Sequence, residues 1–235
     1  MEYILELPPV SRKFIDKIAP LAKNVFNAVF IPSGPAGIPL LDACATSIYI
    51  STVYGLKSIF SIRLKDVNLN HVIEKVKTAM EFGINGVLLT KGDPPRYGSS
   101  YDDLSSEYVL KYLREINVDM KLGLIISLRY PLGSILKRIS EKPDFVFIIH
   151  HVDNDLDKLM ELRKHIAGEI KIYDFILLGV DKNIELFKEL GQKYVEPMKL
   201  GDHIEKLNNI VDGVIISSPL EVKKAIEIVS KLVEK

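Results

Sequence analysis

The chain has 235 residues, which is long enough to bury one large hydrophobic core. Its 31 basic and 31 acidic residues give a formal net charge of zero and are spread along the chain, so we expect neither nucleic acid nor an anionic membrane as a partner. The single cysteine, Cys44, excludes an internal disulfide and a multi-cysteine metal site. With no signal sequence and no apolar run of roughly 18 to 20 residues, the sequence predicts a cytoplasmic protein.

Apolar runs of strand length alternate with amphipathic helical patterns from one end of the chain to the other. The runs are continuous, which is typical of parallel strands that are covered on both faces. Eight such units predict a single (β/α)8 TIM-type barrel, one domain over residues 1–235. The predicted strands are residues 3–7, 28–33, 58–64, 86–90, 121–128, 145–151, 171–179 and 213–218. The least regular stretch is 194–209, where residues 195–198 are either an irregular approach to the last unit or an extra strand.

A barrel carries its chemistry on the loops that follow the strands. Two carboxylates, Glu6 and Asp93, follow the first and fourth predicted strands, on opposite sides of the ring, so that a ligand between them could contact both. The other candidates are Ser33, Arg63, Lys91, Arg129, His150, His151, residues 179–181, Ser217 and Ser218. Because neighbouring strand residues point to opposite faces, His150 and His151 cannot bind one ion together, and we predict no metal site.

Glu6 stands between Leu5 and Leu7, and apolar surroundings would raise the pKa of its carboxyl and suit it to proton donation near neutral pH. The alternative is a solvated or ion-paired residue at a strand end. Asp93 follows Gly92, which permits close approach of a ligand to the backbone; the alternative is that Asp93 caps the next helix. Ser217 and Ser218 precede the last helix, where they could hold a phosphate but more simply cap the helix.

Two motifs resemble the methylenetetrahydrofolate reductase family. They are the stretch Tyr-Ile-Leu-Glu-Leu-Pro-Pro at residues 3–9 and the stretch Gly-Val-Leu-Leu-Thr-Lys-Gly-Asp-Pro-Pro at residues 86–95. The resemblance implies Glu6 and Asp93 as catalytic residues. It implies Lys91, Gly92, Asp93, Tyr101 and Arg138 as cofactor contacts and His150 as a substrate contact.

The activity implied by this resemblance is flavin-dependent reduction of a methylene-pterin in one-carbon metabolism and methionine biosynthesis. Glu6 would donate the proton and reduced FAD, or FMN, the hydride; NAD(P)H or a partner protein would supply electrons. The chain departs from the family in residues 61–64, at Pro32 and Ser33, and at Ile149, which stands where the family has a glutamine. These departures are the reason for an alternative, a non-catalytic pterin- or flavin-binding subunit of a larger complex. A further alternative is a methyltransferase or lyase that uses Glu6 and Asp93 on a pterin. The protein could also assemble as a homo-oligomer.

Overall fold

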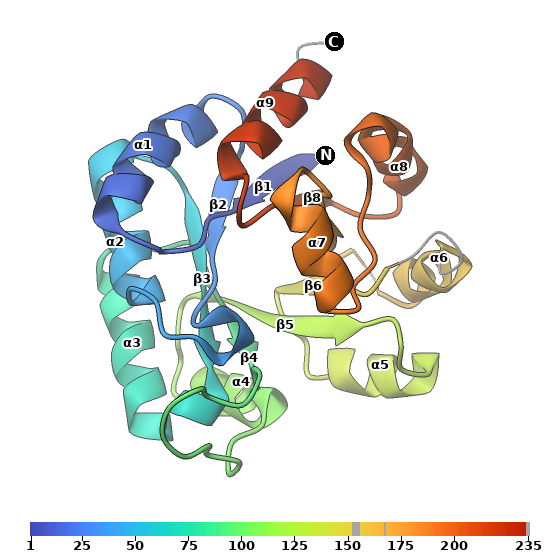
Figure 1. Ribbon diagram of the computed structural model, residues 1–235. Coiled ribbons are helices and arrows are strands. Elements are labelled where there is room, and N and C mark those ends of the chain that lie inside the picture. Colours follow the sequence, from blue (N-terminus) through green and yellow to red (C-terminus); the bar gives the residue numbers. More distant parts are fainter. Residues whose placement is uncertain (152–155, 167, 234–235) are drawn as a thin grey trace.

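The computed structural model describes residues 1–151, 156–166 and 168–233, in which strands and helices alternate (Figure 1). The strands are β1 (Glu2–Glu6), β2 (Ala28–Ile31), β3 (Ser58–Arg63), β4 (Gly86–Thr90), β5 (Lys121–Ser127), β6 (Phe145–Ile149), β7 (Lys171–Leu177) and β8 (Gly213–Ser217). The helices are α1 (Arg12–Lys23), α2 (Ala43–Tyr54), α3 (Leu69–Glu81), α4 (Ser106–Glu115), α5 (Leu132–Ile139), α6 (Leu156–His165), α7 (Lys182–Glu189), α8 (Leu200–Leu207) and α9 (Val222–Val233).

The strands form one closed parallel barrel in chain order, and β8 closes the ring by pairing with β1, with Leu5 opposite Ile216. Figure 1 shows the helices placed around the strands, with α1, α2 and α3 on one side and α5 and α6 on the other. The predicted (β/α)8 barrel is therefore confirmed. The stretch at 195–198 is not a ninth strand, because Val195 makes only an isolated bridge to Leu178 and a short 3-10 turn, Pro197–Lys199, leads into α8.

The first four helices begin where the sequence offers a side-chain acceptor for an otherwise unbonded backbone N–H. Ser11, Asp42, Asn68 and Ser105 cap α1, α2, α3 and α4, each accepting a hydrogen bond from the N–H three residues further on. These short amphipathic helices then bury one face against the strands. Within the described parts of the chain, none of the helices is both long enough and apolar enough to span a lipid bilayer.

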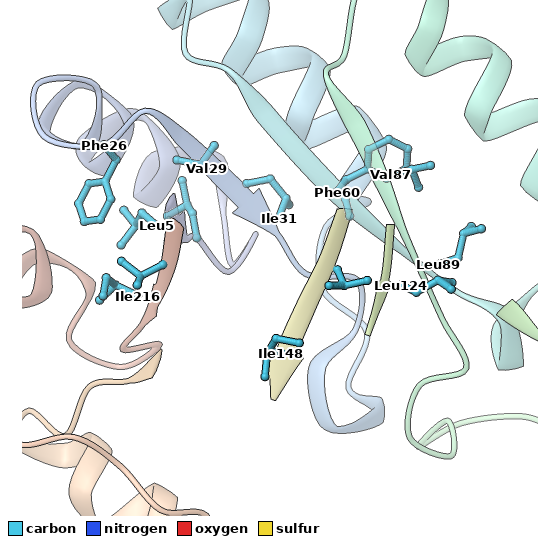
Figure 2. Close-up of a cluster of buried hydrophobic side chains, with 14 of the residues drawn as sticks. Leu5, Phe26, Val29, Ile31, Phe60, Val87, Leu89, Leu124, Ile148 and Ile216 are labelled. Carbon is cyan, nitrogen blue, oxygen red and sulfur yellow. The ribbon is translucent and has the colours of Figure 1, made fainter. Parts of the chain in front are cut away.

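Two hydrophobic cores result, because successive strand residues point to opposite sides of the barrel wall. The larger core lies between strands and helices, and Figure 2 shows part of it, including Leu5, Ile31, Phe60 and Ile216. The smaller core fills the barrel interior with Ile4, Ala28, Phe30, Ile59, Leu88, Phe145, Phe147, Tyr173 and Ile215. The interior is thus packed with side chains and is not a channel.

The same alternation sets polar groups on top of the interior core. On β1, Ile4 points into the barrel, so Glu6 two residues later points inward at the strand end. On β8, Ile215 and Ser217 follow the same rule. The last inward-facing side chains of several strands therefore meet at the carboxyl end of the barrel, where barrel enzymes carry their active sites.

Candidate active site at the barrel mouth

A hollow of about 180 Å³ lies directly above the interior core. Three aromatic side chains, Phe30, Phe147 and Phe175, line it together with the carboxyl-bearing residues Glu6 and Asp93. The rings of Phe30 and Phe147 meet edge to face, with centroids 5.1 Å apart. The site therefore combines an apolar floor with polar groups at its rim, as small-molecule sites do.

Glu6 is the buried acid of this hollow, with 9% of its surface exposed. Burial raises the pKa of the Glu6 carboxyl to about 7, while a hydrogen bond donated by the Ser217 hydroxyl lowers it in part. The raised pKa agrees with the sequence-based expectation, although Leu5 and Leu7 are not the cause, since both belong to the outer core. The aromatic side chains of the hollow supply the apolar surroundings instead.

Arg63, at the end of β3, ties together the loops that shape the hollow. Its buried guanidinium donates to the carbonyl of Gly34 and, through Nη2, to the carbonyl of Asp93 at 2.6 Å. Its Nε lies 3.0 Å from Oδ2 of Asp66. Gly34 and Gly92 both adopt positive φ, and a Cβ on either would lie 2.9 Å from an Arg63 nitrogen. Arg63 therefore holds the loops after β2 and β4 in place.

The loop after β4 contains several of the predicted site residues. Gly92 and Asp93 line the hollow with Glu6, so the two predicted acidic residues lie at one cavity. Asp93 is exposed, and it does not cap α4, because that cap is Ser105. Lys91 instead forms an exposed ion pair with Asp102, with Nζ 2.9 Å from Oδ1.

The remaining predicted contacts lie elsewhere. Tyr101 is 52% exposed, and its backbone N–H donates to the carbonyl of Lys65. Arg138, on α5, donates from Nε to the carbonyl of Ile125 at 3.0 Å and pairs with Glu107 of α4. Neither residue is among those that line the hollow. Their predicted roles rest on the sequence resemblance alone.

His150 lines a second cavity, of about 580 Å³, beside the first. It adopts a left-handed backbone conformation with φ of 60°, and its Nδ1 lies 2.9 Å from the Ser127 hydroxyl. Burial, followed by the charge of Arg129, lowers the pKa of His150. Phe175 lines both cavities.

The second cavity also contains a cluster that the sequence reasoning missed. His151, Asp174 and His203 place their ligand-type atoms within 4.8 Å of one another, an arrangement that could hold a metal ion. We predicted no metal site because only the pair His150 and His151 was weighed. The available signal was Asp174, a lone acid inside the apolar run of residues 171–178. His203 lies in the stretch that was hardest to interpret.

Comparison with known proteins identifies the fold. No protein-family model matches the sequence, and no curated protein matches it either. Two solved variants of the tryptophan synthase alpha-subunit from the hyperthermophile Pyrococcus furiosus align at TM-scores of 0.68 and 0.67 and at 12% and 14% identity, each over 100% of this chain and 98% of the other. A designed cube-shaped protein cage aligns at a TM-score of 0.61 and 13% identity, over 100% of this chain and 71% of that chain. At these identities the likeness shows a shared barrel.

The predicted membership of the methylenetetrahydrofolate reductase family is therefore wrong, because the barrels that this chain resembles in structure are tryptophan synthase alpha-subunits. The predicted flavin-dependent reductase activity and its place in methionine biosynthesis are wrong with it. The two motifs have structural causes within the barrel: Pro8 and Pro9 follow the end of β1, and Gly92 supplies a positive φ against Arg63. The cofactors FAD, FMN and NAD(P)H rested on the same resemblance and stay untested predictions.

Proposed function

We propose that the protein is an enzyme that transfers a proton to or from a small, largely apolar molecule, with Glu6 as the general acid and base. One observation carries this proposal: Glu6 is a buried carboxyl with a pKa of about 7 in a hollow at the carboxyl end of a (β/α)8 barrel. A titratable group that is perturbed by desolvation in a cleft is a candidate catalytic group. The barrel mouth is the place where this fold carries catalysis.

The pKa of Glu6 suits both directions of proton transfer. Near neutral pH a carboxyl with this pKa is present in both forms, so the acid can donate and the carboxylate can accept. The Ser217 hydroxyl fixes the position of one carboxyl oxygen by donating to Oε2. The other oxygen, Oε1, is then the atom that we assign to the substrate proton.

The shape of the hollow favours a small substrate with a flat or apolar part. Phe30, Phe147 and Phe175 would contact that part, and the volume of about 180 Å³ is below the range of roughly 300 to 1,000 Å³ for drug-sized ligands. Asp93, at the exposed rim, would face a polar end of the molecule. The structural neighbours support an enzyme, since tryptophan synthase alpha-subunits use the same barrel. The proposal allows the enzyme to act with a partner subunit or as a homo-oligomer.

The test is to incubate the purified protein with a small-molecule extract of cells and to follow the extract by mass spectrometry and proton–deuterium exchange. We expect the wild-type protein to consume or deuterate at least one compound, and Glu6→Gln to do so about 10² to 10⁴ times more slowly. Glu81→Gln, at the exposed end of α3, is the matched control and should behave as wild type. Equal turnover by Glu6→Gln and wild type would refute the proposal.

A further inference from the structure

Three side chains from separate elements converge behind the barrel wall. His151 follows β6, Asp174 lies in the middle of β7, and His203 lies on α8. Nδ1 of His151 is 3.1 Å and Nε2 of His203 is 3.7 Å from the same carboxylate oxygen, Oδ2 of Asp174. These separations lie on either side of the roughly 3.4 Å expected between two ligand atoms that are each about 2.1 Å from one tetrahedral ion.

Asp174 is an acidic residue at a position where the hydrophobic core would favour an apolar side chain. Its neighbours in alternation on β7, Ile172 and Ile176, belong to the outer hydrophobic core, and the Asp174 side chain is only 1% exposed. Its second oxygen, Oδ1, has no hydrogen-bond partner among the described residues. A buried carboxylate oxygen without a hydrogen bond is costly, and a cation bound between Asp174 and the two histidines would compensate the negative charge.

The cluster also opens onto space for an exogenous ligand. All three side chains line the cavity of about 580 Å³, and the His203 side chain is 11% exposed. Arg129 and Lys199 line the same cavity and bring positive charge to it. Three protein ligands with one open position are typical of metal sites that bind a water or a substrate, whereas structural zinc sites are closed by four protein ligands.

We propose that His151, Asp174 and His203 bind one divalent transition-metal ion, with zinc as the best match, and that the open coordination position faces the cavity. Two imidazoles and one carboxylate are ligands that suit zinc and its first-row neighbours and do not suit calcium or magnesium, which prefer oxygen. A water or a small anion would complete the coordination, and the positive charge of Arg129, which lines the same cavity, would favour an anion. This site is separate from Glu6, so it stands or falls independently of the proton-transfer proposal.

Titration of chelator-treated wild-type protein with Co²⁺ and with Zn²⁺ tests the site. We expect one equivalent of Co²⁺ to give the strong visible absorption of a low-coordinate nitrogen and oxygen site, and Zn²⁺ to displace it and raise the unfolding temperature. Inorganic phosphate should then change the Co²⁺ spectrum, because it can enter the open position. Absence of a stoichiometric Co²⁺ or Zn²⁺ complex in the wild-type protein would overturn the proposal without any variant.

The variants Asp174→Asn and His203→Gln locate the ion. Each should weaken Co²⁺ binding by at least tenfold, whereas His71→Gln and His165→Gln, which change exposed histidines on α3 and α6, should leave binding unchanged. Circular dichroism of each metal-free variant shows whether it is folded. Binding that is lost in the His71 or His165 variants, or retained in folded Asp174→Asn and His203→Gln, would place the metal elsewhere and overturn the assignment.

Discussion

The Ser217 hydroxyl donates a hydrogen bond to the Glu6 carboxylate, and the two residues end the last and the first strand of the barrel. The closure of the ring between β8 and β1 thus positions the proposed acid. Because this hydrogen bond favours the ionised form, Ser217→Ala should raise the pKa of Glu6 above about 7. The pH dependence of the Glu6 carboxyl ¹³C shift, compared between the two proteins, measures the change. An unchanged or lower pKa in the variant would show that the hydrogen bond does not tune Glu6.

Glu6 should also make folding stability depend on pH. Its pKa is about 7 in the folded chain against an ordinary value of 4.5, so the stabilisation is complete below about pH 4.5 and is lost as the pH rises through about 7. Over that window wild type should lose about 3 kcal/mol of unfolding free energy relative to Glu6→Gln. Urea denaturation of both proteins at the two ends of the window measures this difference. Parallel pH profiles would contradict the assigned burial.

The loop connection made by Arg63 gives a third prediction. Arg63→Met keeps the apolar stem but leaves the carbonyls of Gly34 and Asp93 without their donor, so it should cost about 3 kcal/mol. Arg96→Met, which changes an exposed arginine in the loop after β4, is the matched control and should change stability by less than about 0.5 kcal/mol. The denaturation midpoints of the two variants, each compared with wild type, measure these changes in stability. Equal effects would mean that Arg63 does not connect the loops.

A pair of glycines tests the packing of the barrel interior. A Cβ at Gly123 would lie 2.1 Å from the ring of Phe145, which is itself packed against Phe147 and Tyr173, so Gly123→Ala should cost about 3 kcal/mol. A Cβ at Gly133, on the exposed side of α5, would meet no atom of the described residues within 4 Å. Gly133→Ala should therefore stabilise the protein by up to about 1 kcal/mol. Thermal unfolding of both variants tests these two predictions. An unchanged stability of Gly123→Ala would argue against the described packing of the barrel interior.

The sequence predicts the barrel well because buried parallel strands leave a strong local signal. All eight strands occur where the apolar runs indicated, and the differences lie at the ends, as in β7, which stops at Leu177 although the apolar run continues through Leu178. Hydrophobicity continues past the end of β7, since Leu178 also faces the outer core. The meeting of Glu6 and Asp93 at one hollow also followed from strand order alone.

The rest of the site depends on contacts between distant residues, which a local pattern does not contain. The sequence indicates only that Arg63 is a cation at the end of a strand. The structure shows that its guanidinium donates hydrogen bonds to the loops after β2 and β4. The sequence predicts Ser217 to be a helix cap. In the structure α9 begins at Val222, and the Ser217 hydroxyl donates a hydrogen bond to Glu6. His203 and Asp174 are 29 residues apart and belong to different elements. The resemblance to the reductases was misleading, because its two motifs are sequences that end strands and have structural causes within the barrel.

The most direct measurement is the pKa of Glu6 itself, taken from the carboxyl ¹³C shift in the wild-type protein labelled with [¹³C]glutamate, with Glu6→Gln used to assign the resonance. We expect a single titration with a midpoint of about 7, because the carboxyl is buried among aromatic side chains and, among the residues that the structure describes, Ser217 alone stabilises its charge. A midpoint near the ordinary value of 4.5 would show that Glu6 is solvated, and would remove the basis for acid–base catalysis at the barrel mouth.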